Sequence, residues 1–396
     1  MYFLPDFGSA PILMDELASY LAARGHKVEV ITTIPRIYKK GNYEGRFYVE
    51  EEGKGFFIKR FWTNTTPSFF GRFLAWSIYA FWGMFNILTI NKGDTLFLRL
   101  PPLHLGLVGI LAKRLKGAKV VLNIQDIHPD LAIEAGILSN PLVIKMARIF
   151  ERLVYRESDL IIVISEDFRK NLQNKGVDAD KMMIIPNWVD VDFLKPLPKD
   201  NHISRGLCLA DKFVVMYAGT ISITNFLSLA GILEAANLLK DDTGIIFVIV
   251  GEGLKKEALQ EKAKELNLTN VKFLPFFSYE NLPNLLAASD ILVVPLDTDK
   301  AELSVPSKLY SFMAAGKPIL CLAKGTSEVA KMITEASCGF CVMSEEVLKI
   351  KKIIQDLKNS DEYRKNLAQC GRKYVLENFA KERVLKMYEE TISLLK

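Results

Sequence analysis

The strongest constraint on the fold is an alternation of apolar strand patterns with amphipathic helix patterns that runs twice along the chain. The first series ends at the strand expected for residues 182–185, and the second begins at the strand expected for residues 213–218. Such alternation produces parallel sheets covered by helices on both faces. The sequence therefore predicts an α/β protein with two Rossmann-like, doubly wound domains that face each other across a cleft, with ligands at the carboxyl ends of the strands.

The individual elements follow from the same patterns. Further strands are expected at 26–32, 56–61, 94–98, 119–124, 160–164, 245–250, 271–274, 291–296, 318–322 and 339–343. Between them, residues 39–52 are polar and are predicted to form a mobile segment. We place the domain boundary after residue 187, with residues 188–379 as the second domain and a C-terminal helix, residues 380–396, returning to the first.

The beginning of the sequence departs from the doubly wound pattern. Met1–Leu4 resembles the end of a strand, and Pro5–Pro11 resembles the loop that follows it. We therefore expect the native first strand to be missing from this sequence. A parallel sheet that lacks a central strand leaves backbone groups of the neighbouring strands unpaired.

The stretch Ser304–Pro318 is the most informative for chemistry. It follows an apolar strand pattern at 291–296 and contains Pro306, which suits the first position of a helix. Lys308 then lies in the first helical turn, where free N–H groups, the helix dipole and a lysine together favour a phosphate. The alternative is an ordinary crossover helix that carries one exposed lysine.

Composition excludes several classes of protein. With 49% hydrophobic and 24% charged residues the chain is globular. The net charge of +5 falls within residues 1–187, which favours an anionic surface or substrate for that half but is too sparse for nucleic acid. Five cysteines and four scattered histidines form no disulfide framework and no zinc pattern, so we expect a reduced cytoplasmic setting without a secretory signal.

Residues 73–90 carry no charge and contain six aromatic side chains. The segment is at the lower limit for a spanning helix, and its aromatic residues are spread around the helix. We interpret it as buried or as dipping into a membrane. Together with the apolar helix expected at 103–115 and the lysines and arginines around both, it predicts attachment to an anionic membrane surface. The alternative is that both helices pack inside the first domain.

Taken together, the motifs resemble the family 4 retaining glycosyltransferases of GT-B fold, and within them the bacterial branch of L-fucosamine and colanic-acid glycosyltransferases. The resemblance covers nearly the whole chain. Its landmarks are Tyr2–Ser9, Leu21–Val28, Gln125–Asp126, Ile185–Asp190, Tyr217–Gly219, Val250–Gly253, Val305–Lys308 and Ala314–Pro318.

The resemblance implies a nucleotide-sugar donor, expected to be a UDP-sugar, held mainly by the second domain, and a lipid-linked or glycan acceptor held by the first. It implies no cofactor and no requirement for a divalent metal. The donor residues that it implies are Gly8, Ser9, Gly219, Thr220, Gly251, Gly253, Leu274, Pro306, Ser307, Lys308 and Ser311.

Several positions depart from the family pattern. Many relatives bind the diphosphate with an arginine and a lysine where this chain has Thr220 and Asn225, so Lys308 is the expected replacement. Two glutamates of the family pattern correspond to Leu303 and Ser311, and Glu302 is one residue out of register.

Acceptor chemistry is expected after the strand at 119–124. Asp126 and His128 are the candidate catalytic residues, because a carboxylate or imidazole there can orient or deprotonate a hydroxyl. Asp130 and Glu134 are acceptor candidates. The alternative is that these acids cap a helix N-terminus. A second pattern, Asp297–Asp299, resembles a metal-binding Asp-x-Asp, but a solvated loop is the favoured interpretation.

Three functions fit these observations. The first is a retaining glycosyltransferase of cell-surface glycan synthesis, peripheral on the inner face of the cell membrane. The second is a sugar-nucleotide epimerase of the same architecture, which requires more acid and base residues than the second half offers. The third is a non-catalytic partner that binds nucleotide or membrane.

Overall fold

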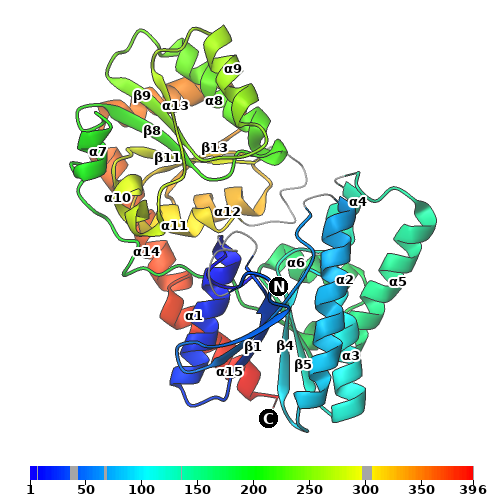
Figure 1. Cartoon of the computed structure of the whole chain (residues 1–396). Helices are drawn as coiled ribbons and strands as arrows, with labels where there is room; N and C mark the ends of the chain where they lie inside the picture. Colours follow the sequence, from blue (N-terminus) through cyan, green and yellow to red (C-terminus); the bar gives the residue numbers. More distant parts are fainter. Residues whose placement is uncertain (7, 36–42, 67–68, 135, 297–305, 396) are drawn as a thin grey trace. The chain divides into compact units, whose positions relative to one another are not determined.

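A computed structural model describes residues 1–6, 8–35, 43–66, 69–134, 136–296 and 306–395, and Figure 1 shows it coloured along the chain. The chain divides into two compact units. Unit 1 contains Met1–Asn187 and Glu382–Lys396, and unit 2 contains Trp188–Lys381. Each unit has the α/β architecture that the alternating patterns predict.

Unit 2 contains one parallel six-stranded sheet in the order β10-β9-β8-β11-β12-β13. Its strands are β8 (Phe213–Ala218), β9 (Ile245–Val250), β10 (Val271–Leu274), β11 (Ile291–Pro295), β12 (Ile319–Leu322) and β13 (Gly339–Val342). The first strand of the unit thus lies between the second and the fourth, as in doubly wound nucleotide-binding folds.

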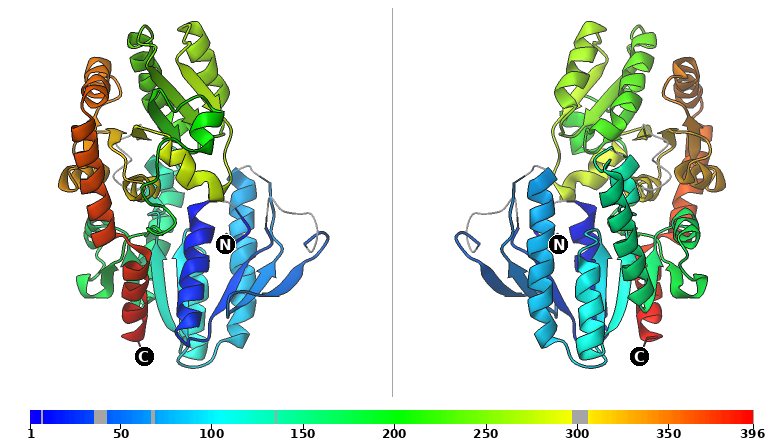
Figure 2. Two further views of the ribbon diagram at one scale, coloured as in Figure 1. Left: turned by 90° about the vertical axis from the view of Figure 1, so that its left-hand side faces the viewer. Right: turned by 90° about the vertical axis from the view of Figure 1, so that its right-hand side faces the viewer.

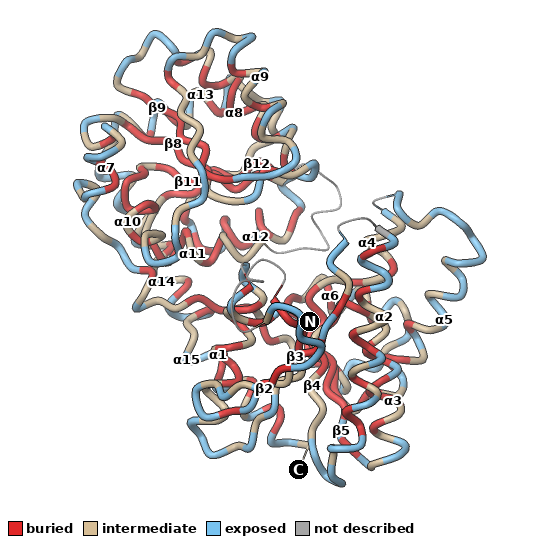
Figure 3. The backbone as a smooth tube through the Cα atoms, viewed as in Figure 1, coloured by how far each residue is buried: buried red, intermediate tan, exposed pale blue. Residues whose placement is uncertain are grey.

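Helices cover both faces of this sheet. They are α7 (His202–Gly206), α8 (Phe226–Leu238), α9 (Lys256–Glu265), α10 (Leu282–Ala287), α11 (Lys308–Ala314), α12 (Glu328–Glu335), α13 (Val347–Asn359) and α14 (Asp361–Asn378). Successive residues of β8 enter different cores: Val214 and Met216 belong to one apolar cluster, and Val215 and Tyr217 belong to the other. Burial on both faces explains why the four inner strands β8, β9, β11 and β12 read as continuous apolar runs, and Figure 3 shows these strands as largely buried.

The strands described in unit 1 form two separate sheets. β1 (Glu29–Thr33), β3 (Phe57–Phe61) and β2 (Tyr48–Glu52) form the first, and β4 (Thr95–Leu100), β5 (Lys119–Ile124), β6 (Leu160–Val163) and β7 (Met182–Ile184) form the second. The interruption lies where the sequence predicts an incomplete first strand.

The expectation of a polar mobile segment at residues 39–52 is wrong for its last part. Tyr48–Glu52 forms β2, which pairs antiparallel with β3 at the edge of the first sheet. Val49 is the buried residue of this strand, and three consecutive glutamates follow it. The short edge strand therefore gives almost no apolar alternation in the sequence.

The helices of unit 1 are α1 (Ser9–Ala23), α2 (Phe69–Asn86), α3 (Leu105–Lys116), α4 (Asp130–Glu134), α5 (Pro141–Glu157), α6 (Glu166–Asn174) and α15 (Lys381–Ser393). Short 3-10 turns occur at Ile87–Thr89, Ala179–Lys181, Ile223–Asn225 and Tyr279–Asn281. The C-terminal helix α15, red in Figures 1 and 2, returns to unit 1 beside α1, where Glu389 accepts hydrogen bonds from Tyr20 and Arg24.

Helices α2, α3 and α5 pack as neighbours through glycines. A Cβ on Gly83 of α2 would lie 3.1 Å from Val108 of α3, and one on Gly106 of α3 would lie 2.3 Å from Val154 of α5. α3 is largely buried, whereas α2 buries one side and exposes Phe70, Phe81 and other aromatic residues on the opposite side. Within the described residues, no helix is both long enough and apolar enough to span a membrane.

Candidate active site

The candidate donor site in unit 2 is organised around Lys308, the first residue of α11. Its Nζ atom donates a hydrogen bond to the Tyr217 hydroxyl at 3.1 Å and lies 4.5 Å from the centre of the Tyr217 ring. Burial lowers the pKa of Lys308 to about 8. In the part of the chain that the structure describes, no carboxylate forms an ion pair with this ammonium group. A half-buried cation without a described counter-ion is suited to an anionic ligand.

Tyr217 is held in place by the loop that follows β8. Its hydroxyl donates to the Thr220 carbonyl oxygen at 2.6 Å. The Asn225 side-chain amide donates to both the Tyr217 hydroxyl, at 3.1 Å, and the Thr220 carbonyl, at 2.9 Å. Thr220 and Asn225 carry no charge and cannot take the place of Lys308. They instead hold Tyr217, the hydrogen-bond partner of Lys308, in position.

Three glycines allow two loops to approach this point. A Cβ on Gly219 would lie 2.4 Å from Lys308 Nζ, so the ammonium group lies directly against the Gly219 backbone. A Cβ on Gly251 would lie 1.9 Å from the Gly219 carbonyl oxygen, and one on Gly253 would lie 2.0 Å from that of Ile221. The glycine turn after β9 thus supports the loop after β8.

We expect Gly251→Ala to destabilise unit 2, because the new methyl group cannot fit against the Gly219 carbonyl oxygen. Overpacking of this kind costs roughly 1–3 kcal/mol, which for a unit of this size corresponds to a melting temperature lower by about 3–10 °C. Gly206→Ala is the matched control, because nothing lies within 4 Å of a Cβ at that position. Thermal unfolding that is equal for the two variants would contradict the assigned packing.

The other predicted donor residues lie in both units. Leu274 ends β10, and its carbonyl oxygen accepts a hydrogen bond from Gly251 N at 3.0 Å. Ser311 is half-buried on α11. Gly8 caps α1, which begins at Ser9, in unit 1. Its φ of 120° requires glycine.

The expectation that Pro306 begins the helix is wrong by two residues. α11 begins at Lys308, after Ser307, and the Pro306 carbonyl oxygen accepts a hydrogen bond from Leu309 N at 3.0 Å. The tight turn before the helix, from Pro306 to Leu309, accounts for the shift. The positions Leu303 and Glu302 and the Asp297–Asp299 pattern lie outside the described residues.

Unit 1 places Asp126 directly after β5 in a turn fixed by side-chain amides. Asn187 donates to Gln125 at 2.9 Å, Gln125 donates to Asn123 at 2.7 Å, and Asn123 donates to the Tyr388 hydroxyl of α15 at 2.8 Å. Burial raises the pKa of Asp126 to about 6, although the nearby Arg99 acts in the opposite direction. A carboxylate in this range can both accept and release a proton near neutral pH.

His128 lies in an aromatic environment. Its ring is 5.9 Å from the Trp76 ring of α2, and Trp76 also lies 6.2 Å from the ring of His104. Burial lowers the pKa of both histidines, and Asp130 opposes this effect for His128. Neutral imidazoles beside an indole can contact the polar and apolar faces of a sugar.

Asp130 has a structural partner. It forms an ion pair with Lys175 at 2.8 Å, and Lys175 also pairs with the buried Glu151 of α5 at 2.6 Å. This network joins the start of α4 to α5 and α6, which favours a structural role for Asp130. Glu134 is exposed at the end of α4, and its acceptor role stays a prediction.

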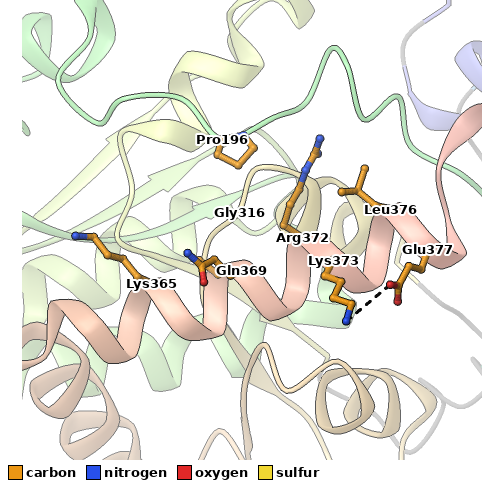
Figure 4. A pocket seen from close by; sticks show the side chains of 9 residues that line it. Pro196, Gly316, Lys365, Gln369, Arg372, Lys373, Leu376 and Glu377 are labelled. Atoms are coloured by element: carbon orange, nitrogen blue, oxygen red, sulfur yellow. Dashed lines mark ion pairs between the residues drawn. The ribbon is translucent and has the colours of Figure 1, made fainter.

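A cavity of about 420 Å³ in unit 2 lies elsewhere, along α14 (Figure 4). Arg372 lines it, but its guanidinium donates to the carbonyl oxygens of Leu194, Ala314 and Val191 at 2.8–2.9 Å. Because the charge is used to hold three backbone segments together, we assign this pocket no part in donor binding.

Sequence reasoning missed several residues of these sites. The sequence identifies Tyr217, which holds Lys308, as part of a motif but not as a site residue. Trp76 and His104 were not singled out, because the contacts that bring α2 to the ends of β4 and β5 are long-range.

Among the described residues, no three histidine, cysteine, aspartate or glutamate side chains are placed to hold a metal ion.

Two family models match the chain in succession. Residues 12–188 match the glycosyl transferase 4-like domain, and residues 208–374 match glycosyl transferases group 1. The fold is shared with solved structures over nearly their whole length. Anabaena HepE in complex with UDP-glucose superposes with a TM-score of 0.72 at 16% identity, covering 99% of this chain and 98% of that one. For sucrose-phosphate synthase from Thermosynechococcus elongatus the TM-score is 0.76 at 16% identity, covering 98% and 94%. The protein is a glycosyltransferase of GT-B fold.

The relatives in sequence narrow this class. The chain is 30% identical over 345 residues to the putative colanic acid biosynthesis glycosyl transferase WcaI of Escherichia coli strain K12, with 84% of each chain covered. It is 24% identical over 269 residues to the probable glycosyltransferase WbjE of Pseudomonas aeruginosa, covering 67% and 66%. The chain belongs to family 4 of the GT-B glycosyltransferases.

Proposed function

We propose that the protein is a retaining glycosyltransferase that moves a sugar from a UDP-sugar to a lipid-linked or polysaccharide acceptor in the synthesis of a cell-surface glycan such as O-antigen, capsule or exopolysaccharide. The observation that carries the donor assignment is the half-buried ammonium of Lys308, held by Tyr217 against the backbone of Gly219. Its charge is suited to the diphosphate of a nucleotide-sugar.

The names of similar proteins support this substrate class. The sequence is 26% identical over 246 residues to the lipopolysaccharide 1,2-N-acetylglucosaminetransferase of Salmonella typhimurium strain LT2, covering 59% of this chain and 62% of that one. An Escherichia coli relative, 28% identical over 198 residues, is named as a UDP-Gal:alpha-D-GlcNAc-diphosphoundecaprenol alpha-1,3-galactosyltransferase, with 48% and 49% covered.

In the proposed reaction the donor diphosphate binds at Lys308 and leaves as UDP. With its pKa near 6, Asp126 is mostly ionised at neutral pH and can accept the proton of the acceptor hydroxyl, and His128 can orient that hydroxyl. The sugar keeps its anomeric configuration by front-face attack, assisted by the departing diphosphate. No step in this scheme requires a divalent metal.

We further propose that unit 1 docks on the anionic inner face of the cell membrane through the exposed side chains of three neighbouring helices, here called the helical face. Its exposed apolar residues are Phe70, Phe73, Leu74, Phe81 and Phe85 of α2, Leu107 and Leu115 of α3, and Leu142, Val143, Met146 and Ile149 of α5. On α5, Leu142, Met146 and Ile149 follow helical spacing, and Lys145, Arg148 and Arg152 line the adjacent side. Apolar and basic side chains in this arrangement are suited to the headgroup region of an anionic bilayer.

Acceptor-dependent release of UDP is the expected activity. The purified protein is incubated with UDP-sugars, with and without an extract of bacterial lipids, and both free UDP and the radiolabel transferred to lipid are measured. We expect UDP release that requires the lipid extract and is accompanied by labelled lipid. Both products should form equally with and without EDTA. Isomerised donor without transfer would instead indicate an epimerase, and binding of UDP without either product would indicate a non-catalytic partner.

A further inference from the structure

Two cysteines lie directly opposite each other on neighbouring strands of the unit 2 sheet. Cys321 belongs to β12 and Cys341 to β13, and the two residues are register partners in this parallel pair. Side chains of register partners project from the same face of a sheet. Accordingly, Cys321 is a member of one apolar cluster, and Cys341 packs against that same cluster. The two thiols are therefore neighbours on one face of the sheet.

The two sulfur atoms are also in contact. The Cys321 thiol donates a hydrogen bond to the Cys341 sulfur, and the Cys341 thiol donates to the Ala323 carbonyl oxygen at 3.4 Å. Neighbouring strands lie about 4.8 Å apart, and a disulfide joins Cα atoms that are about 4.4–6.8 Å apart. A bond between these two sulfur atoms therefore requires only a small movement of the backbone.

The two thiols differ in access and in acidity. The Cys321 side chain is fully buried, at 0% exposure, whereas Cys341 is partly exposed. The hydrogen bond from Cys321, opposed by burial, lowers the pKa of Cys341, and the same hydrogen bond together with burial raises the pKa of Cys321. Because the thiolate is the form that reacts with oxidants, Cys341 is the thiol that an oxidant attacks first.

We propose that Cys321 and Cys341 form a redox modification site, at which a peroxide oxidises Cys341 and Cys321 then closes a reversible disulfide between β12 and β13. In the first step the Cys341 thiolate attacks the peroxide, so that an S–O bond forms, the O–O bond breaks and hydroxide leaves. In the second step Cys321 attacks the Cys341 sulfenic acid. The S–S bond forms, the S–O bond breaks, and the Cys321 proton leaves with the oxygen as water. A dithiol reductant restores both thiols by exchange.

Oxidation is expected to affect the candidate donor site through α11. Leu309 and Met313 of α11 lie in the same apolar cluster as Cys321, and Leu309 directly follows Lys308. A disulfide brings its sulfur atoms to about 2.05 Å, which is closer than a hydrogen bond allows, so β12 and β13 have to shift against α11. We expect this shift to displace Lys308 and to lower UDP affinity severalfold. This consequence rests on the proposed function, whereas the disulfide itself does not.

The test oxidises the whole folded chain with hydrogen peroxide, blocks the remaining thiols, and maps disulfides by mass spectrometry after unfolding and chymotrypsin digestion without reductant. Cleavage after Phe340 separates Cys338 from Cys341, so the two residues are told apart. We expect most of the oxidised Cys341 in a peptide linked to Cys321. This product should be lighter by two hydrogen atoms than its two peptides together, and dithiothreitol should separate it.

Two serine variants distinguish this pair from thiol oxidation in general. Cys338→Ser is the matched control, because Cys338 is as deeply buried as Cys321 but precedes β13, and its thiol contacts the Ile333 carbonyl oxygen at 3.9 Å. The link between Cys321 and Cys341 should form in this variant as in the unaltered chain. In Cys321→Ser the second thiol is absent, so Cys341 should accumulate as the sulfenic acid, which dimedone traps.

Three results would overturn the proposal. They are Cys341 oxidised in the unaltered chain without a link to Cys321, a link to Cys338 in place of Cys321, and a link that forms only in urea. The map of the unaltered chain needs no variant, so it decides the question even if Cys321→Ser does not fold. A disulfide that leaves UDP affinity unchanged would overturn the effect on α11 alone. A chain that binds no UDP in either redox state would count against the proposed function instead.

Discussion

Lys308→Ala is expected to weaken UDP binding by about ten- to a hundredfold. The lost contact is a charge-assisted hydrogen bond, which contributes roughly 1.5–3 kcal/mol. Lys308 is the charged residue that the structure places against the Gly219 loop, and Thr220 and Asn225 cannot replace its charge. Isothermal titration of UDP measures the loss, and an unchanged dissociation constant would contradict the assignment of Lys308 to the diphosphate.

Two further variants separate charge from position. Lys373→Ala removes one exposed positive charge from the same unit, so it controls for net charge and is expected to leave UDP binding unchanged. Tyr217→Phe keeps the ring but removes the hydroxyl that accepts the hydrogen bond from Lys308. A smaller loss is expected for it than for Lys308→Ala, because the ammonium group remains but is less well positioned.

The pH dependence gives an independent measurement. Because the pKa of Lys308 is about 8, lowered from 10.5 by burial, UDP affinity should be highest below pH 8 and should fall as the ammonium loses its proton above it. Stability changes in the opposite direction. The folded state loses this proton at a lower pH than the unfolded state does. The contribution of Lys308 to the free energy of unfolding therefore increases as the pH rises from about 8 to 10.5. A loss of UDP affinity in that pH range therefore cannot be explained by a destabilising effect of Lys308 on the fold.

The sequence was most informative where its elements are long and buried. β5, β8 and β9 have the predicted bounds, because strands covered on both faces leave clear apolar patterns. β2 was missed, since a short edge strand with one buried residue has no such pattern. α7, which is only five residues long, was also missed.

The candidate sites show a similar division. The role of Lys308 is predicted from a local signal of strand, loop and helix. Its partner Tyr217 is 91 residues away, and Trp76 and His128 are brought together from different elements. Such pairs depend on tertiary packing, which a single sequence does not display. The role of Asp130 was ambiguous for the same reason, since Lys175, its ion-pair partner, lies far along the chain.

Removal of two exposed aromatic residues from the helical face is expected to weaken membrane attachment strongly. Phe81→Ser with Phe85→Ser removes two phenyl rings from adjacent turns of α2, both more than half exposed. At roughly 1.5 kcal/mol for each side chain that leaves the lipid, binding to anionic vesicles should fall by about a hundredfold. Flotation of the protein with phosphatidylglycerol-containing liposomes measures the effect.

The matched control is Leu254→Ser with Leu348→Ser, which removes two exposed apolar side chains from unit 2 and should leave flotation unchanged.

Lys145→Gln with Arg148→Gln tests the electrostatic contribution on α5. At about 1 kcal/mol for each basic residue near an anionic surface, this pair should reduce binding by about thirtyfold and make the remainder less sensitive to salt. A chain that stays at the bottom of the gradient at low salt would refute docking. Equal losses for the unit 1 and unit 2 variants would show that exposed apolar area in general, and not the helical face, causes the attachment.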